Sequence, residues 1–279
     1  MNAIMAADGT VSAIVPQIWS QRFTDNLRAA LPWVDSVAKD YEGEVKNLGD
    51  RVLIPTLPDG AEADVIQEGA SADAKATTAF TTPLIINKQV VWDFIVTGIS
   101  RLQSISYMDQ MRDIAINAIM QKMQSIIMDE ISPSSSAPDH TIAYASGTTL
   151  AYADILSAKR LLDAQNVPKP GRVLISGTGQ SNDLLNVINF VNSQYNGGDA
   201  ASKSGQVNGQ VLGFVPKDTT ANANSTYCFH PSFLQMAVQK SLSIGIYDLG
   251  VVGERSFRVN VDLLFGVKQV HDERIVSIN

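Results

Sequence analysis

The stretch GDRVLIPTLPDGAEADVIQEGASADAKATTAFTTPLIINKQVVWDFIV, residues 49–96, holds two strand-like segments joined by a long piece with little to bury. The first segment, RVLIP at residues 51–55, is a short apolar run that ends at a proline. In the second, apolar and polar side chains alternate, which places on one face Leu84, Ile86, Val90, Trp92, Phe94 and Val96. The pattern predicts a β-strand on each side of the joining piece.

The joining piece, residues 60–80, has seven alanines, and its only large apolar side chains are Val65, Ile66 and Phe80. A loop of more than ~15 residues without structure of its own is uncommon in a compact domain unless it has a function. An isolated two-stranded ribbon is only marginally stable in water. We therefore expect residues 60–80 to form the tip of a hairpin that lies on another surface.

The overall composition is that of a globular protein. Of its 279 residues, 45% are hydrophobic and 18% are charged, and the formal net charge is -7. This charge argues against tight sequence-independent binding to nucleic acid, which needs Lys and Arg along the phosphates. No apolar run is long enough to span a bilayer, no signal peptide is recognisable, and the single cysteine, Cys228, fits a reducing cytoplasm. We expect no membrane partner.

Residues 1–48 have the pattern of an arm with one short helix. Trp19, Phe23 and Leu27 recur at i, i+4 and i+8, and Pro32 is expected to end that helix. The part before Pro16 has little that could pack by itself, so the arm is also expected to lie on another surface.

A long helix is predicted from about Ser100 to Ile131. Its main apolar stripe consists of Met108, Met111, Ala115, Ile119, Met123 and Ile126. The apolar residues off this stripe are Ile114, Ile116, Met120 and Ile127. We expect the helix to be packed on several sides, with the methionines filling the core rather than gripping a cofactor.

The following part has the pattern of a compact α/β unit. The segment YADILSAKRLLDAQN, residues 152–166, predicts a helix with Ala151, Ile155, Ala158 and Leu162 on one face and Asn166 at its left-handed C-terminal position. Residues 172–176 predict a strand, and residues 181–191 a second helix with Ser181 as N-cap and Asp183 in its first turn. Near the C-terminus, an unbroken alternation predicts a strand that carries Phe257, Val259, Val261, Leu263, Phe265 and Val267.

LISGTGQSND, residues 174–183, is the strongest enzyme-like signal, because a strand, a glycine turn and a helix N-terminus can bind an anion through backbone amides. The third glycine of the dinucleotide fingerprint is replaced by Asn182, and the Gly-Lys-Ser/Thr ending of a phosphate loop is missing. The simpler interpretation is a tight strand-to-helix turn. A nucleotide-binding α/β enzyme that uses residues 176–183 is the alternative of another class.

The other reactive side chains indicate no catalytic, cofactor or metal site. His140, His230 and His271 have no ligand at zinc-like spacing. Cys228 and His230 are placed on one strand face, where core packing is the simpler explanation. The acidic residues between positions 59 and 73 lack the spacing of an EF-hand.

Taken in order, these parts resemble a tailed-bacteriophage major capsid protein of the HK97 fold over nearly the whole chain. GDRVLIP at 49–55 is similar to the GDxVxIP strand that opens the E-loop in that family. LLDAQNVPKPGRVLIS at 161–176 resembles the family's xNVP turn before an arginine-led strand, and GQVLGFVP at 209–216 its GxxxGF segment.

The resemblance implies an α+β fold of five parts. These are an N-terminal arm at 1–48, an E-loop that is an extended β-hairpin at 49–97, a P-domain with a long spine helix at 98–144, an A-domain at 145–250, and C-terminal strands at 251–279 that return to the P-domain. Encapsulins share the fold, so the shell of an encapsulin-type nanocompartment is the closest alternative.

The function implied is that of a non-catalytic coat protein. It would assemble in the host bacterial cytoplasm as pentamers and hexamers into an icosahedral virion shell, with a portal at one vertex, around double-stranded DNA that it binds without sequence specificity. Because 48 residues are too few for both an arm and a scaffolding segment, either a separate scaffolding protein is used, which is the expectation here, or none is needed.

The expected intersubunit contacts lie in the arm and the E-loop. They are Trp19, Phe23, Leu27, Asp64, Val65, Ile66, Glu68, Lys75 and Phe80. A few members of the family join subunits through a Lys to Asn isopeptide bond beside a glutamate. Lys75 and Glu68 lie in the E-loop, but no feature identifies an acceptor asparagine, so non-covalent shells are expected.

Overall fold

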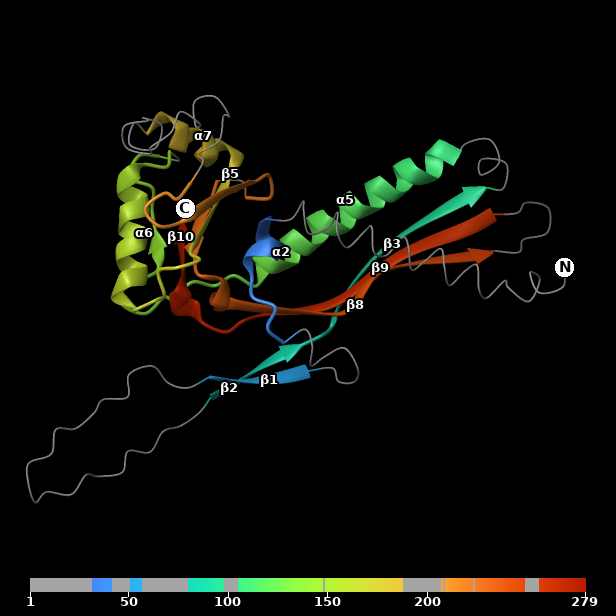
Figure 1. Ribbon diagram of the computed structural model, residues 1–279, viewed down its shortest axis with the longest axis horizontal. Coiled ribbons are helices and arrows are strands. Elements are labelled where there is room, and N and C mark those ends of the chain that lie inside the picture. Colours follow the sequence, from blue (N-terminus) through green and yellow to red (C-terminus); the bar gives the residue numbers. More distant parts are fainter. Residues whose placement is uncertain are drawn as a thin grey trace, which may run out of the picture.

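The computed structural model describes residues 32–41, 51–56, 80–97, 105–147, 149–187, 207, 209–222, 224–248 and 256–279. The helices and strands are α2 (Pro32–Ser36), β1 (Arg51–Thr56), β2 (Phe80–Ile85), β3 (Lys88–Thr97), α5 (Ile105–Asp129), β4 (Thr141–Ile142), α6 (Tyr152–Ala164), β5 (Val173–Gly177), α7 (Thr178–Asn186), β6 (Val215–Thr219), β7 (Thr226–Phe229), β8 (Leu234–Asp248), β9 (Ser256–Gln269) and β10 (Ile275–Ile278), with 3-10 turns at Pro231–Phe233 and Asp272–Arg274. Figure 1 shows a long sheet with α5 on one side, the hairpin β1–β2 on the other, and an α/β body at one end. The predicted α+β class is confirmed.

The long sheet has three strands in the order β3-β9-β8, and both pairings are antiparallel. The alternation predicted for β9 is confirmed, because every second side chain from Val259 to Val267 is buried. Val90, Trp92 and Phe94 of β3 pack against the same core. The single strand predicted for residues 84–96 is instead interrupted after Ile85, because its two halves pair with different partners, β2 with β1 and β3 with β9.

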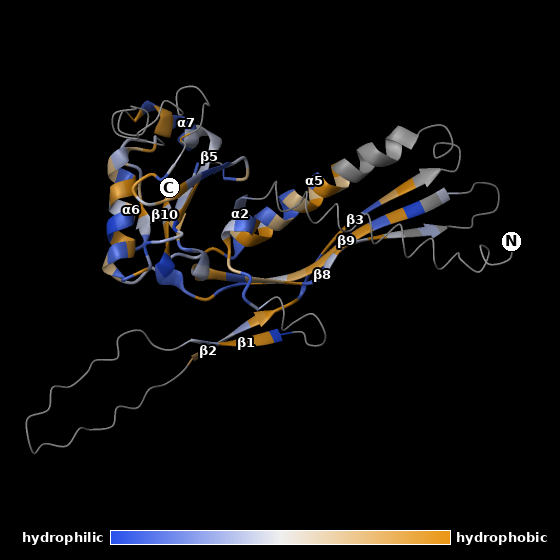
Figure 2. Ribbon diagram, viewed as in Figure 1, coloured by the Kyte–Doolittle hydropathy of each residue, from blue (hydrophilic) through white to orange (hydrophobic). Residues whose placement is uncertain are grey.

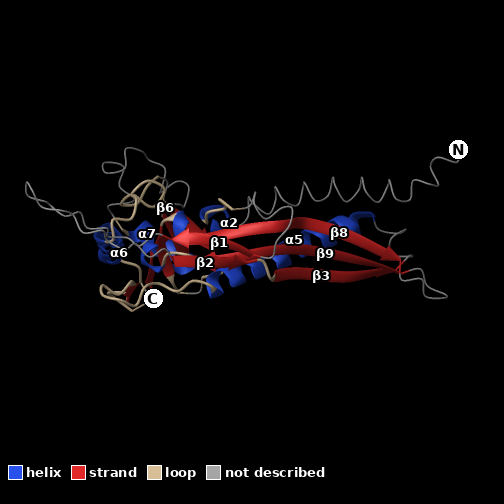
Figure 3. Ribbon diagram, turned by 90° about the horizontal axis from the view of Figure 1, so that it is seen from below, coloured by secondary structure: helices blue, strands red, loops and turns tan. Residues whose placement is uncertain are grey.

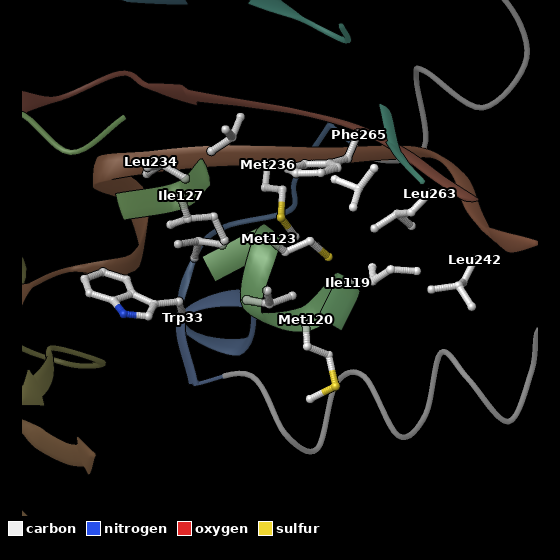
Figure 4. Packing of buried hydrophobic residues seen from close by; sticks show 14 of the residues in the cluster. Trp33, Ile119, Met120, Met123, Ile127, Leu234, Met236, Leu242, Leu263 and Phe265 are labelled. Atoms are coloured by element: carbon white, nitrogen blue, oxygen red, sulfur yellow. The ribbon is translucent and has the colours of Figure 1, made fainter. Parts of the chain in front are cut away.

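The main core lies between α5 and the inner face of this sheet. In Figure 4, Ile119, Met123 and Ile127 point from α5 towards the strands that carry Met236 and Phe265. Both groups of apolar residues predicted for the helix contribute buried side chains, namely Ala115, Ile116, Ile119, Met120, Met123 and Ile127. Ile126 of the main stripe is only partly buried against the core, and Ile114 is 51% exposed.

The helix α5 is shorter at its C-terminal end than predicted, since it ends at Asp129. Residues 100–104 and the side chains of Met108 and Met111 lie outside the described residues. In the part of the chain that the structure describes, no helix combines the length and the apolar character needed to cross a membrane.

The segment around Trp33 begins a helix at the proline that was predicted to end one. Pro32 is the first residue of α2, and the helix predicted before it lies outside the described residues. A proline fits the first turn of a helix, where its missing N–H would have no partner. Trp33, Val34 and Val37 are buried in the main core, so this part of the predicted arm belongs to the subunit's own interior.

The α/β body is built on a five-stranded sheet in the order β4-β10-β7-β5-β6. The helix α6 buries Ile155, Ala158 and Leu162 as predicted. Asn166, with φ of 55°, has the expected left-handed conformation after the helix. This body has its own apolar cluster, which includes Leu174 and Cys228.

The predicted start of α7 is wrong. Gly177 is the N-cap and the helix begins at Thr178, because β5 runs directly into it. Ser181 and Asp183 therefore lie within the helix, beyond its first turn. The carboxylate of Asp183 instead accepts a hydrogen bond from the backbone N–H of Leu150 at 3.0 Å.

The two sheets combine strands from different predicted parts of the chain. β3, expected within the E-loop, and β8, expected within the A-domain, both pair with β9. β10 does not accompany β9. It lies inside the five-stranded sheet between β4 and β7. All four of its residues are buried because both faces of the strand are covered: Ile275 belongs to the main core, and Val276 and Ile278 belong to the apolar cluster of the α/β body.

Candidate subunit interface

The hairpin β1–β2 has two different faces. Leu53 pairs with Pro83 and Val52 pairs with Leu84. Directly paired residues of an antiparallel ladder project to the same side, and successive residues alternate between sides. The inner face therefore carries Val52, Ile54, Thr56, Phe80, Thr82 and Leu84, and the outer face carries Arg51, Leu53, Pro55, Thr81, Pro83 and Ile85.

The inner face anchors the hairpin to the long sheet. Ile54, Leu84 and Ile86 are buried together with Ala237 of β8, and partly buried side chains pack around them, namely Tyr41, Val52, Leu264 and Val270. Figures 1 and 3 place the hairpin against the end of the sheet nearest the α/β body, on the side away from α5. This cluster is separate from the main core, so the hairpin is held by its own small group of contacts.

The outer face of the hairpin is apolar and uncovered. Leu53 is 58% exposed and Ile85 is 44% exposed, and Pro55 and Pro83 are exposed as well. Figure 2 shows that β1 is largely apolar apart from its arginine end. Full burial of one such aliphatic side chain contributes about 1.5–3 kcal/mol. A partner that docks on this face would contact its side chains, because the backbone hydrogen-bonding groups point towards the strand edges.

The outer face of the long sheet, beyond the hairpin, carries two carboxylates with fixed partners. Burial opposes ionisation of Asp262, but hydrogen bonds from Lys240, at 2.6 Å, and from Ser243 hold its pKa below the ordinary value. A hydrogen bond from Arg258 lowers the pKa of Asp93, to which Asn260 also donates.

Apolar side chains flank these ionic pairs on the same face. Val91 and Ile95 on β3 and Tyr247 on β8 are exposed large hydrophobic residues. A neighbouring protein could contact these apolar side chains, but covering the ionic pairs between them would carry a desolvation cost.

Of the contact residues predicted from the sequence, Phe80 is the one that the structure describes. It is the first residue of β2, pairs with Thr56 and is 63% exposed. The others lie outside the described residues, namely Trp19, Phe23, Leu27, Asp64, Val65, Ile66, Glu68 and Lys75. The exposed Leu53 and Ile85 were missed, because the consecutive apolar residues in RVLIP and at the end of FTTPLI do not show which side of each strand is covered.

Within the described part of the chain, the glycine turn at residues 176–183 forms no nucleotide-sized site. Ser176, Ser181 and Lys217 are among the residues that line a hollow of about 50 Å³. Small-molecule sites usually enclose about 300–1,000 Å³. The ammonium group of Lys217 donates a hydrogen bond to the Ser36 hydroxyl at 2.8 Å, and burial lowers its pKa.

The cysteine and the histidine beside it have structural surroundings. Burial raises the pKa of the Cys228 thiol to about 12, so the thiol stays protonated at neutral pH. His230 lies just past the end of β7, where its Nδ1 accepts a hydrogen bond from the backbone N–H of Ser232, and burial lowers its pKa. Within the described ranges, no three His, Cys, Asp or Glu side chains are grouped to hold a metal ion.

Comparison with known proteins gives matches among solved structures. No protein-family model and no curated protein matches the sequence. A chain from Mycobacterium phage Che8 is 21% identical with a TM-score of 0.70, and the match covers 89% of this chain and 91% of that one. The mature capsid of bacteriophage PhiM1 gives 14% identity and a TM-score of 0.62, with coverage of 84% and 83%. The capsid of Ralstonia phage GP4 gives 14% identity and a TM-score of 0.62, with coverage of 86% and 85%.

These matches span most of both chains, and at such identities they concern the fold. They confirm the resemblance drawn from the sequence. The chain has the fold of bacteriophage capsid proteins.

Proposed function

We propose that this protein is a major capsid protein, the subunit of a closed virion shell. One observation carries the proposal: the outer face of the hairpin exposes Leu53 and Ile85, and no other described part of the chain covers them. A shell subunit has identical neighbours on every side, and an apolar face of this kind is buried when one neighbour docks on it. The fold shared with phage capsid structures supports this assignment.

The parts of the HK97 arrangement follow from this proposal. The hairpin β1–β2 is the base of the E-loop, α5 is the spine helix of the P-domain, and the five-stranded sheet with α6 and α7 forms the A-domain. Subunits associate as pentamers and hexamers into an icosahedral shell, with a portal at one vertex and a separate scaffolding protein during assembly in the host cytoplasm. The net charge of -7 fits a shell that encloses double-stranded DNA without binding it tightly.

No catalytic step belongs to this function. The hollow of about 50 Å³ at the glycine turn is too small for a nucleotide. The Cys228 thiol, with its pKa of about 12, supplies no thiolate at neutral pH.

Assembly of a charged variant tests the proposal. Leu53→Asp places a carboxylate on the outer face of the hairpin, and we expect closed particles to be lost while the subunit stays folded. Ile114→Asp is the matched control, because Ile114 is similarly exposed but lies on α5, on the other side of the sheet. Sedimentation velocity and electron microscopy measure the particles, and circular dichroism checks folding. Normal particles from Leu53→Asp, or equal loss from both variants, would contradict the role of this face.

A further inference from the structure

The chain between β2 and β3 crosses the outer face of the long sheet at Gly266. β3 begins at Lys88, which pairs with Phe265, so Gly266 is the next residue along β9. A Cβ atom on Gly266 would lie 2.5 Å from the carbonyl oxygen of Ile85 and 3.0 Å from the Cα of Ile86. Both are backbone atoms and cannot rotate away. A glycine within a strand is expected where another backbone approaches this closely.

At the crossing point, the outer face of the sheet carries little side-chain volume. Gly266 pairs with Ala237, which is fully buried under the hairpin. On the same face, the neighbouring pairs of β8 and β9 have larger side chains. These pairs are Gln235 with Lys268 and Lys240 with Leu264. The chain that leaves the hairpin therefore crosses the sheet at the pair Ala237 and Gly266, the two smallest residues on this part of the face.

Gly245, the single glycine of β8, provides a contrast with Gly266, the single glycine of β9. A Cβ on Gly245 would meet the ring of Tyr247, at 2.9 Å from its nearest carbon. That ring is exposed and can turn aside. Each glycine stands between two apolar residues of a strand. Of the two, only Gly266 lies against the backbone of another segment.

We propose that Gly266 is the positioning residue of the hairpin. Its missing side chain lets the Ile85–Ile86 backbone lie against the sheet, and this contact sets the direction in which the hairpin presents Leu53 and its outer face. The docking of the hairpin on its own sheet is a property of the single subunit. The consequence for assembly rests on the proposed function.

Hydrogen–deuterium exchange of the unassembled subunit tests the positioning role. In Gly266→Ala, we expect the amides of residues 51–56 and 80–86 to exchange at least about tenfold faster, because the hairpin opens locally. The amides of α6 and β5 should be unchanged. Gly245→Ala is the matched control and should leave all of these segments as in the wild type. Unchanged exchange of the hairpin in Gly266→Ala overturns the proposal.

A second variant covers the case in which Gly266→Ala disturbs more than the hairpin. Leu84→Ala removes the buried anchor of the hairpin without altering the sheet, and should speed exchange in the same two segments. Adding Leu84→Ala to Gly266→Ala should then have less than about a twofold further effect, because both changes release the same contact. If Leu84→Ala opens only the hairpin while Gly266→Ala unfolds the whole sheet, Gly266 is a core residue and the proposal is wrong.

Imaging of particles from the same variants separates this inference from the proposed function. Faster hairpin exchange together with lost or malformed shells supports both. Faster hairpin exchange with normal shells overturns the role of the hairpin in assembly and leaves the positioning role of Gly266 intact. Lost shells with unchanged hairpin exchange overturn the positioning role alone.

Discussion

The indole ring of Trp33 stacks on the ring of Phe229, with ring centroids 5.4 Å apart and planes 5° apart. Tyr227 meets the same indole edge-on at 5.4 Å. The helix α2 is thereby fixed to β7 of the five-stranded sheet. Val34 and Val37, on the same short segment, share a core with α5 and β9. This segment therefore joins the long sheet to the α/β body.

Replacing Trp33 by alanine should strongly destabilise the subunit. Because the indole is fully buried, Trp33→Ala should lower the free energy of unfolding by about 3–5 kcal/mol. Chemical denaturation of the unassembled subunit measures this loss. Trp19→Ala is the control, since Trp19 is predicted to contact a neighbouring subunit and should change the free energy of unfolding little. A loss below about 1 kcal/mol in Trp33→Ala would contradict the stacking role.

The same substitution at two phenylalanines should have opposite consequences. Phe80 is exposed at the start of β2, whereas Phe265 is fully buried in the main core. Phe80→Ala should change the free energy of unfolding by no more than about 0.5 kcal/mol and should weaken particle assembly. Phe265→Ala should lower the free energy of unfolding by about 3–5 kcal/mol. Normal assembly of Phe80→Ala would remove Phe80 from the predicted intersubunit contacts.

Shortening the hairpin should separate folding from assembly. Thr56 and Phe80 are directly paired, so an Asn-Gly turn can replace residues 57–79 and connect them as a two-residue hairpin. The melting temperature of the subunit should stay within about 3 °C, the shift that about 1 kcal/mol causes in a chain of this size. Microscopy should show absent or malformed shells. An unfolded product would mean that residues 57–79 contribute to the subunit's own core.

The ionic pair at Asp262 should make part of the stability depend on pH. Its pKa is lowered in the folded state, so its contribution is present above the unfolded pKa of about 3.9 and is lost as the pH falls through the folded value. The difference in free energy of unfolding between wild type and Asp262→Asn should therefore shrink from pH 7 to pH 3, as measured by urea denaturation at both pH values. Asp93→Asn should show a smaller change, because solvent screens the more exposed Asp93 pair. A difference for Asp262→Asn that grows on acidification would contradict this assignment.

Nucleotides should not stabilise the protein. Binding to the folded state would raise the melting temperature by mass action. Because the hollow at the glycine turn is about 50 Å³, millimolar ATP or NAD should give no shift in thermal unfolding. Gly179 has free space around it, so Gly179→Val is a suitable control that keeps the turn. A shift of several degrees that Gly179→Val abolishes would support the enzyme alternative.

Local patterns predicted most elements of this fold. The alternation in Val259–Val267, the stripe from Ala115 to Met123 and the left-handed Asn166 all appear as expected. Each depends on which side of a strand or helix is buried, and that information repeats every few residues along the chain. The exposed outer face of the hairpin was not within reach of this reasoning, because Val52, Leu53 and Ile54 are all apolar.

The tertiary structure decided which elements pair and where backbones approach each other. The alternation of residues 84–96 could not show that β2 and β3 have different partners, nor could the apolar run of β10 show that it lies between β4 and β7. Periodicity reports burial, but not the identity of the covering element. The burial of Trp33 and the close approach at Gly266 likewise depend on contacts between residues far apart in sequence, so only the folded chain reveals them.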